Sequence, residues 1–147
     1  MKKTVALSIL FCAGLLGAQE RHSPMETVHR FFDAFHAKDS LGMQGVFHPK
    51  ARLLRSTLKN SKPVVVQNNL EKFIRAVATR KATPRWEERL GEPLIHQDQN
   101  LATVWVPFKF YLGDKLSHCG VNAFTLVWNE TDWQILSLID TGTKDCE

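Results

Sequence analysis

Residues 118–140 read HCGVNAFTLVWNETDWQILSLID, and this stretch decides how the C-terminal part of the chain folds. Residues 118–128 and residues 133–140 are rich in β-branched, aromatic and other apolar side chains. Between them, residues 129–132 (NETD) form a cluster of the residue types that favour turns. The pattern therefore predicts a β-hairpin of two long antiparallel strands.

Two cysteines lie near the outer ends of this hairpin. Cys119 precedes the turn by about the distance that strand pairing needs to bring it close to residues 141–146, so a bond between Cys119 and Cys146 is sterically feasible. The chain-entropy model gives a disulfide across a loop of this length about 3.5 kcal/mol of stabilisation. We predict this disulfide, which needs an oxidising compartment. The alternative is two unpaired cysteines, one in a strand and one at the terminus.

The N-terminal segment has the composition of a secretory signal peptide. It begins with a methionine and two lysines, continues without a charge, and ends in the small residues Gly17 and Ala18. We predict a signal peptide over residues 1–18, one domain over residues 19–147, and export to the periplasm or the medium. A lipid anchor at Cys12 is the alternative, but the residue before it is bulky. The apolar run is too short to span a membrane, which takes about 20 residues.

Charge and composition exclude several classes of function. The chain has 19 Lys and Arg residues against 15 Asp and Glu residues, and two of the lysines lie in the predicted leader. Basic and acidic residues are interspersed, as in residues 85–89 (RWEER), which predicts a solvated surface and not the basic face of a nucleic-acid-binding protein. The sequence has neither a His-Glu-x-x-His nor a Cys-x-x-Cys spacing. We therefore predict no nucleic-acid partner, no metal and no cofactor.

Helix signals lie in the first half of the chain. Residues 23–26 (SPME) form a capping box before a helix with a phenylalanine-rich stripe. Asp39 caps a short second helix, which we expect His48-Pro49 to end. Residues 68–69 begin a third amphipathic helix, and Pro84 prevents it from continuing.

Strand signals follow and fill the rest of the chain. Alternate residues of the longest predicted strand form a core face that begins at Ala102, while Trp105 and Tyr111 lie on its other face. Helices followed by long antiparallel strands predict an α+β domain in which the helices cover one face of a curved, mainly antiparallel β-sheet. Besides the hairpin, the predicted strands are residues 51–58, 85–90, 94–97 and 101–112.

This order of elements resembles the nuclear transport factor 2-like superfamily and, within it, exported bacterial proteins of the SnoaL-like and lumazine-binding-like kinds. The resemblance implies a cone-shaped domain with a pocket between the N-terminal helices and the concave face of the sheet. It covers about residues 26–141. It rests on residues 31–39 (FFDAFHAKD), residues 46–51 (VFHPKA), and residues 118–121 (HCGV) leading to residues 133–135 (WQI).

The resemblance also implies a kind of chemistry, because enzymes of this superfamily commonly use a pocket carboxylate or histidine as general base. The candidates here are His118 and Asp140, and Asp140 shares a strand face with Leu136 and Leu138 that could point inward. The alternative is that both are strand-end polar residues bonded to the backbone. An oxyanion hole with a tyrosine on the first helix, as in a steroid isomerase, is excluded because Tyr111 is the only tyrosine.

Aromatic and polar residues that could line the pocket come from several predicted elements. On the first helix, His29, Asp33 and His36 lie within one arc that could hold a metal or a base with its orienting acid, or form a half-exposed polar shoulder. The predicted ligand-binding residues are Phe31, Phe35, Arg55, Trp105, Asn122, Phe124 and Trp128.

The sequence leaves three functions open. The first, which we favour, is an exported, non-enzymatic or cryptically enzymatic domain that binds a small apolar or aromatic ligand in its cone. The second is an isomerase, dehydratase or cyclase with His118 or Asp140 as general base. The third is an association module that forms a homodimer through the outer face of the sheet around Trp105 and Tyr111.

Overall fold

The first helix begins as its capping sequence predicts. The computed structural model describes residues 22–146, so the predicted leader at residues 1–18 and Cys12 lie outside the described residues. Helix α1 spans Pro24–Ala37, and the side chain of Ser23 accepts a hydrogen bond from the backbone N–H of Met25. The carboxylate of Glu26 in turn accepts from the backbone N–H of Ser23 at 2.9 Å.

The two remaining helices also begin at the predicted caps. Helix α2 spans Ser40–Gly45, and the side chain of Asp39 accepts from two backbone N–H groups of its first turn. Helix α3 spans Leu70–Thr79, and Asn69 accepts from the backbone N–H of Lys72 at 2.8 Å. Each short helix is therefore anchored by a side chain at its first turn.

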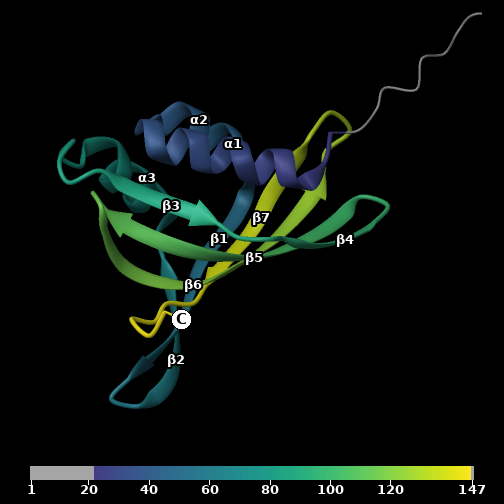
Figure 1. Ribbon diagram of the computed structural model, residues 1–147. Helices are drawn as coiled ribbons and strands as arrows, with labels where there is room; N and C mark the ends of the chain where they lie inside the picture. Colours follow the sequence, from purple (N-terminus) through teal and green to yellow (C-terminus); the bar gives the residue numbers. More distant parts are fainter. Residues whose placement is uncertain (1–21, 147) are drawn as a thin grey trace, which may run out of the picture.

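Seven strands form one mixed, mostly antiparallel sheet, and the α+β fold is confirmed. The sheet has the order β2-β1-β7-β6-β5-β3, with β4 paired to a second part of β5. Among the paired strands of the described residues, only β1 and β7 run parallel. Figure 1 shows that the helices lie together on the concave side of this curved sheet. The strands are β1 (Phe47–Lys59), β2 (Lys62–Asn68), β3 (Trp86–Leu90), β4 (Leu94–Asp98), β5 (Leu101–Leu112), β6 (Lys115–Trp128) and β7 (Trp133–Asp140).

The core lies between α1 and the concave face of the sheet. The ring of Phe31 is buried and contacts Phe47 and Phe124 edge to face, at centroid distances of 5.5 Å and 6.1 Å. On β5 the residues of one face are buried from Ala102 to Phe108, as the alternation predicts. The opposite face of β5 stays exposed, and Trp105 on it retains 53% of its surface.

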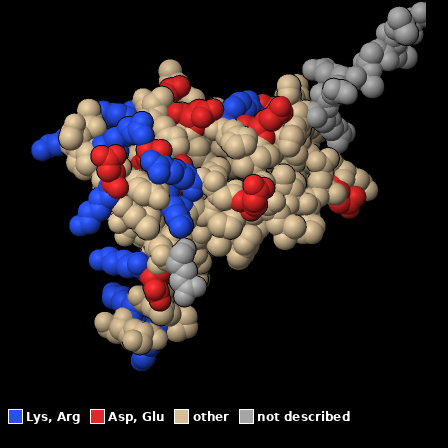
Figure 2. Space-filling model, in the orientation of Figure 1, with Lys and Arg blue, Asp and Glu red and all other residues tan. Residues whose placement is uncertain are grey.

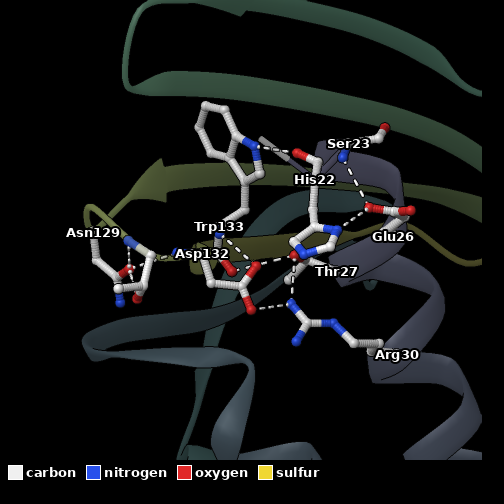
Figure 3. Close-up of polar contacts among 9 residues, drawn as sticks. His22, Ser23, Glu26, Thr27, Arg30, Asn129, Asp132 and Trp133 are labelled. Carbon is white, nitrogen blue, oxygen red and sulfur yellow. Dashed lines mark hydrogen bonds and ion pairs between the residues drawn. The ribbon is translucent and has the colours of Figure 1, made fainter. Parts of the chain in front are cut away.

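A set of polar contacts ties the start of α1 to the turn between β6 and β7 (Figure 3). Trp133 is fully buried, and its indole N–H donates to the carbonyl oxygen of His22 at 2.9 Å. The hydroxyl of Thr27 donates to the carbonyl oxygen of Trp133, and Arg30 forms an ion pair with Asp132 at 2.6 Å. These contacts hold the N-terminal helix across the end of the sheet.

The predicted disulfide is present. Cys119 and Cys146 are bonded, with their Cα atoms 5.8 Å apart. The backbone of Cys119 pairs with that of Thr143 through two hydrogen bonds, so the segment after β7 continues along the edge of β6. None of the helices within residues 22–146 is long and apolar enough to cross a membrane.

Two local predictions were wrong. His48-Pro49 does not form a bend after α2, because α2 ends at Gly45 and both residues lie inside β1. Leu136 does not share the inner face of β7, because a bulge there shifts the register and places Ile135 in the core instead. The sequence also did not predict β2 as a strand, although its valines lead directly to the third helix.

Candidate ligand site in the cone

A cavity of about 660 Å³ lies between the helices and the concave face of the sheet. We call it the cone cavity. Its size falls in the range of small-molecule sites, and aromatic rings form much of its wall. Polar side chains enter it from β1, β3, β6, β7 and the start of α3. The residues that line it are Phe31, Phe32, Phe35, Leu53, Arg55, Asn68, Asn69, Lys72, Phe73, Trp86, Glu88, Phe110, Leu112, His118, Asn122, Leu138 and Asp140.

Strand register brings three of the polar residues side by side. Arg55 on β1 lies opposite Asp140 on β7, and Asp140 lies opposite Asn122 on β6. The Nε atom of Arg55 donates to the two carboxylate oxygens of Asp140 at 3.0 Å and 3.1 Å, and Nη2 donates to Oδ2 as well. The side chain of Asp140 is only 16% exposed. This bidentate pair fixes both charges on the cavity wall.

Glu88 brings a second carboxylate into the cavity from β3. It is partly buried, and its Oε1 atom accepts a hydrogen bond from Nδ2 of Asn122 at 2.6 Å. Asn122 is itself buried, with 4% of its surface exposed. The backbone N–H of Glu88 donates to Nε2 of His36 on α1 at 2.9 Å. Glu88 is thus positioned through both its side chain and its backbone.

The surroundings of Glu88 make its proton easy to exchange near neutral pH. Burial raises the pKa of Glu88 to about 7, because the charged form loses hydration among apolar walls. The negative charge of Asp140 raises this pKa further, while the hydrogen bond from Asn122 and the charge of Arg55 lower it. A carboxyl group with this pKa is present in both protonation states at neutral pH, as general acid–base catalysis requires.

His118 lies beside these groups and is held as a neutral imidazole. Its ring stacks on Phe110 at a centroid distance of 4.9 Å and meets Phe108 edge to face. Burial lowers the pKa of His118 below its usual value, and the charge of Arg55 lowers it further. The ring carries one N–H donor and one acceptor in this state.

The structure brings six of the predicted site residues to the cone cavity and leaves three outside it. Trp105 lies on the outer face of the sheet, Phe124 is enclosed in the core, and Trp128 packs against Trp133 at 5.6 Å. Their aromatic character reflects an exposed face and two packing positions, not a cavity wall. The six that line the cavity are Phe31, Phe35, Arg55, His118, Asn122 and Asp140.

The polar residues predicted on α1 have separate surroundings. His29 and Asp33 are exposed, whereas His36 is partly buried and accepts from the backbone of Glu88. Burial lowers the pKa of His36. Across residues 22–146, no group of three His, Cys, Asp or Glu side chains is placed to hold a metal ion.

Glu88 is one of the lining residues that the sequence did not predict, and it brings a buried carboxyl group into the cavity. Residues 85–89 were predicted to be a solvated surface, and this is wrong for Glu88, although Arg85 and Arg89 are indeed exposed and bond to Glu87. The signal was the strand alternation. Trp86, Glu88 and Leu90 share one face, and two apolar residues on that face indicate that it points inward.

Comparison with known proteins identifies the fold. No protein-family model matches the sequence, and no curated protein matches it either. A nuclear transport factor 2-like protein of unknown function from Shewanella baltica superposes with a TM-score of 0.63 at 14% identity, covering 83% of this chain and 92% of that chain. These values are typical of a shared fold without close sequence similarity.

Two further solved structures have the same fold and different provisional names. One from Streptomyces avermitilis, provisionally named a dehydratase of this superfamily, has a TM-score of 0.63 at 13% identity, covering 81% of this chain and 92% of that chain. One from Thiobacillus denitrificans, provisionally named a kinase association domain, has a TM-score of 0.63 at 10% identity. It covers 84% of this chain and 98% of that chain. The chain therefore has the nuclear transport factor 2-like fold.

Proposed function

We propose that the cone cavity binds a small apolar or aromatic molecule and that Glu88 transfers a proton to or from it. The observation that carries this proposal is a carboxyl group with a pKa of about 7, held by Asn122 in a cavity of about 660 Å³ with aromatic walls. Ligand pockets are typically apolar with a few fixed polar groups, and this cavity has that composition.

Glu88 is the group best suited to move the proton. In its ionised form it accepts a proton from an acidic C–H or O–H group of the ligand, and in its protonated form it returns one. Asp140 is less suited, because Arg55 holds its carboxylate in a bidentate ion pair. His118 offers a neutral ring N–H beside the site, which is suited to bond an oxygen on which charge develops.

This proposal places the chain among isomerases, dehydratases or cyclases. The Streptomyces avermitilis neighbour, provisionally named a dehydratase, supports this class by fold analogy alone. The catalytic candidates predicted from the sequence, His118 and Asp140, become supporting groups. A cavity that binds without reacting is the alternative, and the Glu88 carboxyl group favours the reaction.

Proton exchange tests the proposal without knowledge of the product. Small cyclic ketones and hydroxy-aromatic compounds are incubated with the mature protein in D₂O, and loss of their acidic C–H signals is followed by proton NMR. We expect faster exchange for at least one compound and loss of this effect in Glu88→Gln. Glu87→Gln serves as the control, because Glu87 bonds to arginines outside the cavity. Exchange that is equally fast with Glu88→Gln would refute the role of Glu88.

We also propose that the chain is exported and that residues 1–18 are removed as a signal peptide. The composition of this segment and the Cys119–Cys146 disulfide support export, because such bonds persist in oxidising compartments. N-terminal sequencing of protein from the periplasm or medium tests this. An intact N-terminus on cytoplasmic protein, or a lipid on Cys12, would contradict it.

We also propose that the protein forms a homodimer through the outer face of the sheet. Strand register aligns five apolar residues in one row across five strands of this face. An uncharged row on an outer sheet face is the kind of surface that a second copy covers in a symmetric dimer. The provisional name of the Thiobacillus denitrificans neighbour also supports association. The row consists of Leu94, Trp105, Ala123, Ile139 and Leu54.

A further inference from the structure

We infer that the ligand of the cone cavity is an aromatic carboxylic acid whose carboxylate binds to Lys72 and Arg55. This inference rests on the proposed function, because it names the class of molecule that the same cavity takes. It follows from the distribution of charge over the wall of the cavity. The aromatic part of the ligand fits the rings, and its anionic part fits two cationic side chains.

Lys72 supplies a positive charge to the wall of the cavity. It lies in the first turn of α3 and lines the cone cavity. Its backbone N–H is bonded to the cap residue Asn69, but its ammonium group has no hydrogen bond or ion pair within residues 22–146. Glu71 beside it lines a different cavity, between α2, β1 and α3. The ammonium group is therefore available to a ligand.

Arg55 adds donors from β1, two residues after Leu53, which pairs with Asn68 just before the start of α3. Its Nε and Nη2 atoms are bonded to Asp140, and these bonds leave Nη1 unused. The Arg55 side chain is 45% exposed, so a ligand can reach it without breaking the pair. Arginine suits this role because its fixed fork of donors can hold two carboxylates at once.

The acids of the cavity do not cancel these charges. Asp140 is matched by Arg55, which leaves the charge of Lys72 in excess. Glu88 is uncharged for part of the time at neutral pH, because burial raises its pKa to about 7. The wall thus has a net positive charge below neutral pH and approaches neutrality above it. Figure 2 also shows that Lys and Arg gather on the side of the molecule that carries α3 and the β1–β2 hairpin.

The apolar part of the cavity wall determines which kind of body the carboxylate of the ligand is attached to. Aromatic side chains from α1, α3, β3 and β5 face the cavity together, and rings bind well against rings. The amide side chains of Asn68 and Asn69 lie on the same wall as Lys72 and add donors for a polar group. A flat aromatic body with one carboxylate satisfies both parts of the wall. The rings are those of Phe31, Phe35, Phe73, Trp86 and Phe110.

Matched acid and amide probes test the inference. Isothermal titration calorimetry at pH 6 and low salt compares benzoate, cinnamate and 2-naphthoate with the three corresponding amides. We expect at least one acid to bind about tenfold more tightly than its amide, because the two differ mainly in charge. We expect Lys72→Gln to reduce this preference about fivefold or more and to leave the affinity of the amide unchanged.

Arg75→Gln is the matched control for Lys72→Gln. It removes the same charge from the same helix, but Arg75 lines the cavity between α2, β1 and α3 and not the cone cavity. The acid preference should survive in this variant. Raising the pH from 6 to 8 should weaken the binding of the acid in the wild type, because Glu88 becomes ionised, and should change it much less in Glu88→Gln.

The outcomes separate this inference from the proposal on which it rests. If the amides bind as tightly as the acids, the cavity binds aromatic molecules but the inferred carboxylate is wrong. If the acids bind preferentially and Lys72→Gln does not alter the preference, the assignment to Lys72 is wrong. If no acid and no amide binds to the wild type at millimolar concentration, both the inference and the proposed ligand class are overturned.

Discussion

The backbone N–H of Glu88 donates a hydrogen bond to the Nε2 atom of His36 at 2.9 Å. Nε2 must therefore carry a lone pair, and the proton of the neutral ring lies on Nδ1. The bond joins β3 to α1 at the residue that places a carboxyl group in the cone cavity. The position of Glu88 thus depends on a histidine on another element.

Protonation of His36 should loosen this contact. Burial holds the pKa of His36 below that in the unfolded chain, so the unfolded state takes up a proton first as the pH falls. The contribution of His36 to stability should be complete above pH 7 and should fall as the pH drops below about 6.5. The groups whose charges act on His36 are Asp33 on its own helix, Glu87 and Arg85 at β3, and Arg80 after α3.

His36 accepts a hydrogen bond and can also take up a proton, and two substitutions distinguish these roles. His36→Gln keeps an acceptor near the Nε2 position and cannot be protonated, so its urea midpoint should increase relative to that of the wild type as the pH falls from 7 to 5. His36→Leu leaves the N–H of Glu88 without a partner and should cost about 1–3 kcal/mol at every pH. His29→Gln, on the exposed side of α1, should behave as the wild type does.

Glu88→Gln should stabilise the protein at alkaline pH. Burial raises the pKa of Glu88 from 4.5 to about 7, so the unfolded chain loses its proton first as the pH rises. The stability contribution of Glu88 should therefore decrease from pH 4.5 to about 7 and stay constant above that. At pH 8 the ionised, buried carboxylate of Glu88 should lower the free energy of unfolding by about 3 kcal/mol. Glu88→Gln removes this cost and retains the hydrogen bond from Asn122. Urea unfolding at pH 5 and 8 measures the difference.

Glu87→Gln should destabilise the protein at alkaline pH, which is the opposite of the effect expected for Glu88→Gln. Hydrogen bonds from Arg89 and Arg85 lower the pKa of Glu87, so its favourable contribution is present above the pKa of the unfolded chain and is lost in acid. This variant should be slightly less stable than the wild type at pH 8 and equal to it in strong acid. A parallel response of the two variants would contradict the assigned environments.

Removal of the disulfide should lower the stability of the whole domain. The bond closes a loop between residues 27 positions apart, so the Cys119→Ser, Cys146→Ser double variant should lose about 3.5 kcal/mol. The backbone pairing of Cys119 with Thr143 does not need the bond and should limit the structural change. Wild-type protein in reductant should unfold at the same urea concentration as the double variant. A loss under 1 kcal/mol would show that the terminal segment is held by its backbone pairing alone.

Gly120→Ala should be damaging for a local reason. A Cβ atom at this position would overlap the carbonyl group of Thr141, which is backbone and cannot move away easily. We expect a loss of about 2 kcal/mol, as for an overpacked site, measured by thermal unfolding. Gly45→Ala is the control, because nothing lies within 4 Å of a Cβ atom there and alanine favours the helix. Equal stability of the two variants would contradict the close approach of β6 and the terminal segment.

Charge on the outer face should abolish the proposed homodimer. Trp105→Glu or Ile139→Lys places a charge in the apolar row, and sedimentation equilibrium at 10–200 μM should then give a monomer where the wild type gives a dimer. Leu41→Glu is the control, because Leu41 is 76% exposed on α2, away from the outer face. A wild type that stays monomeric at every concentration would rule out the dimer.

Most of the architecture could be predicted from local signals. The three helix caps, at Ser23, Asp39 and Asn69, lie in the sequence immediately before apolar stripes. The bulge at Leu136 could not be predicted, because it depends on how β7 matches β6 along the whole hairpin. His48-Pro49 looked like a helix end because proline disfavours helix, but proline also fits the first residues of a strand such as β1.

The site was less predictable than the fold. Asn122, Asp140 and Arg55 were candidates because each lies on a strand with apolar neighbours, and register then placed them together. Glu88 lies in a run of charges, and its burial depends on Asn122 and on His36, both distant in sequence. Only the packed fold brings these three residues into contact.

The strand order constrains how the protein can be made. β7 is the last strand to be synthesised, yet it lies in the middle of the sheet between β1 and β6 (Figure 1). Until residues 133–140 emerge from the ribosome, β1 can pair only with β2. Helix α1 also lacks its contact with Trp133 until then. The nascent chain therefore exposes apolar helix and strand edges for most of its synthesis, and a chain that stops before Trp133 should aggregate. We therefore expect folding to become cooperative only when the final strand joins β1 to β6.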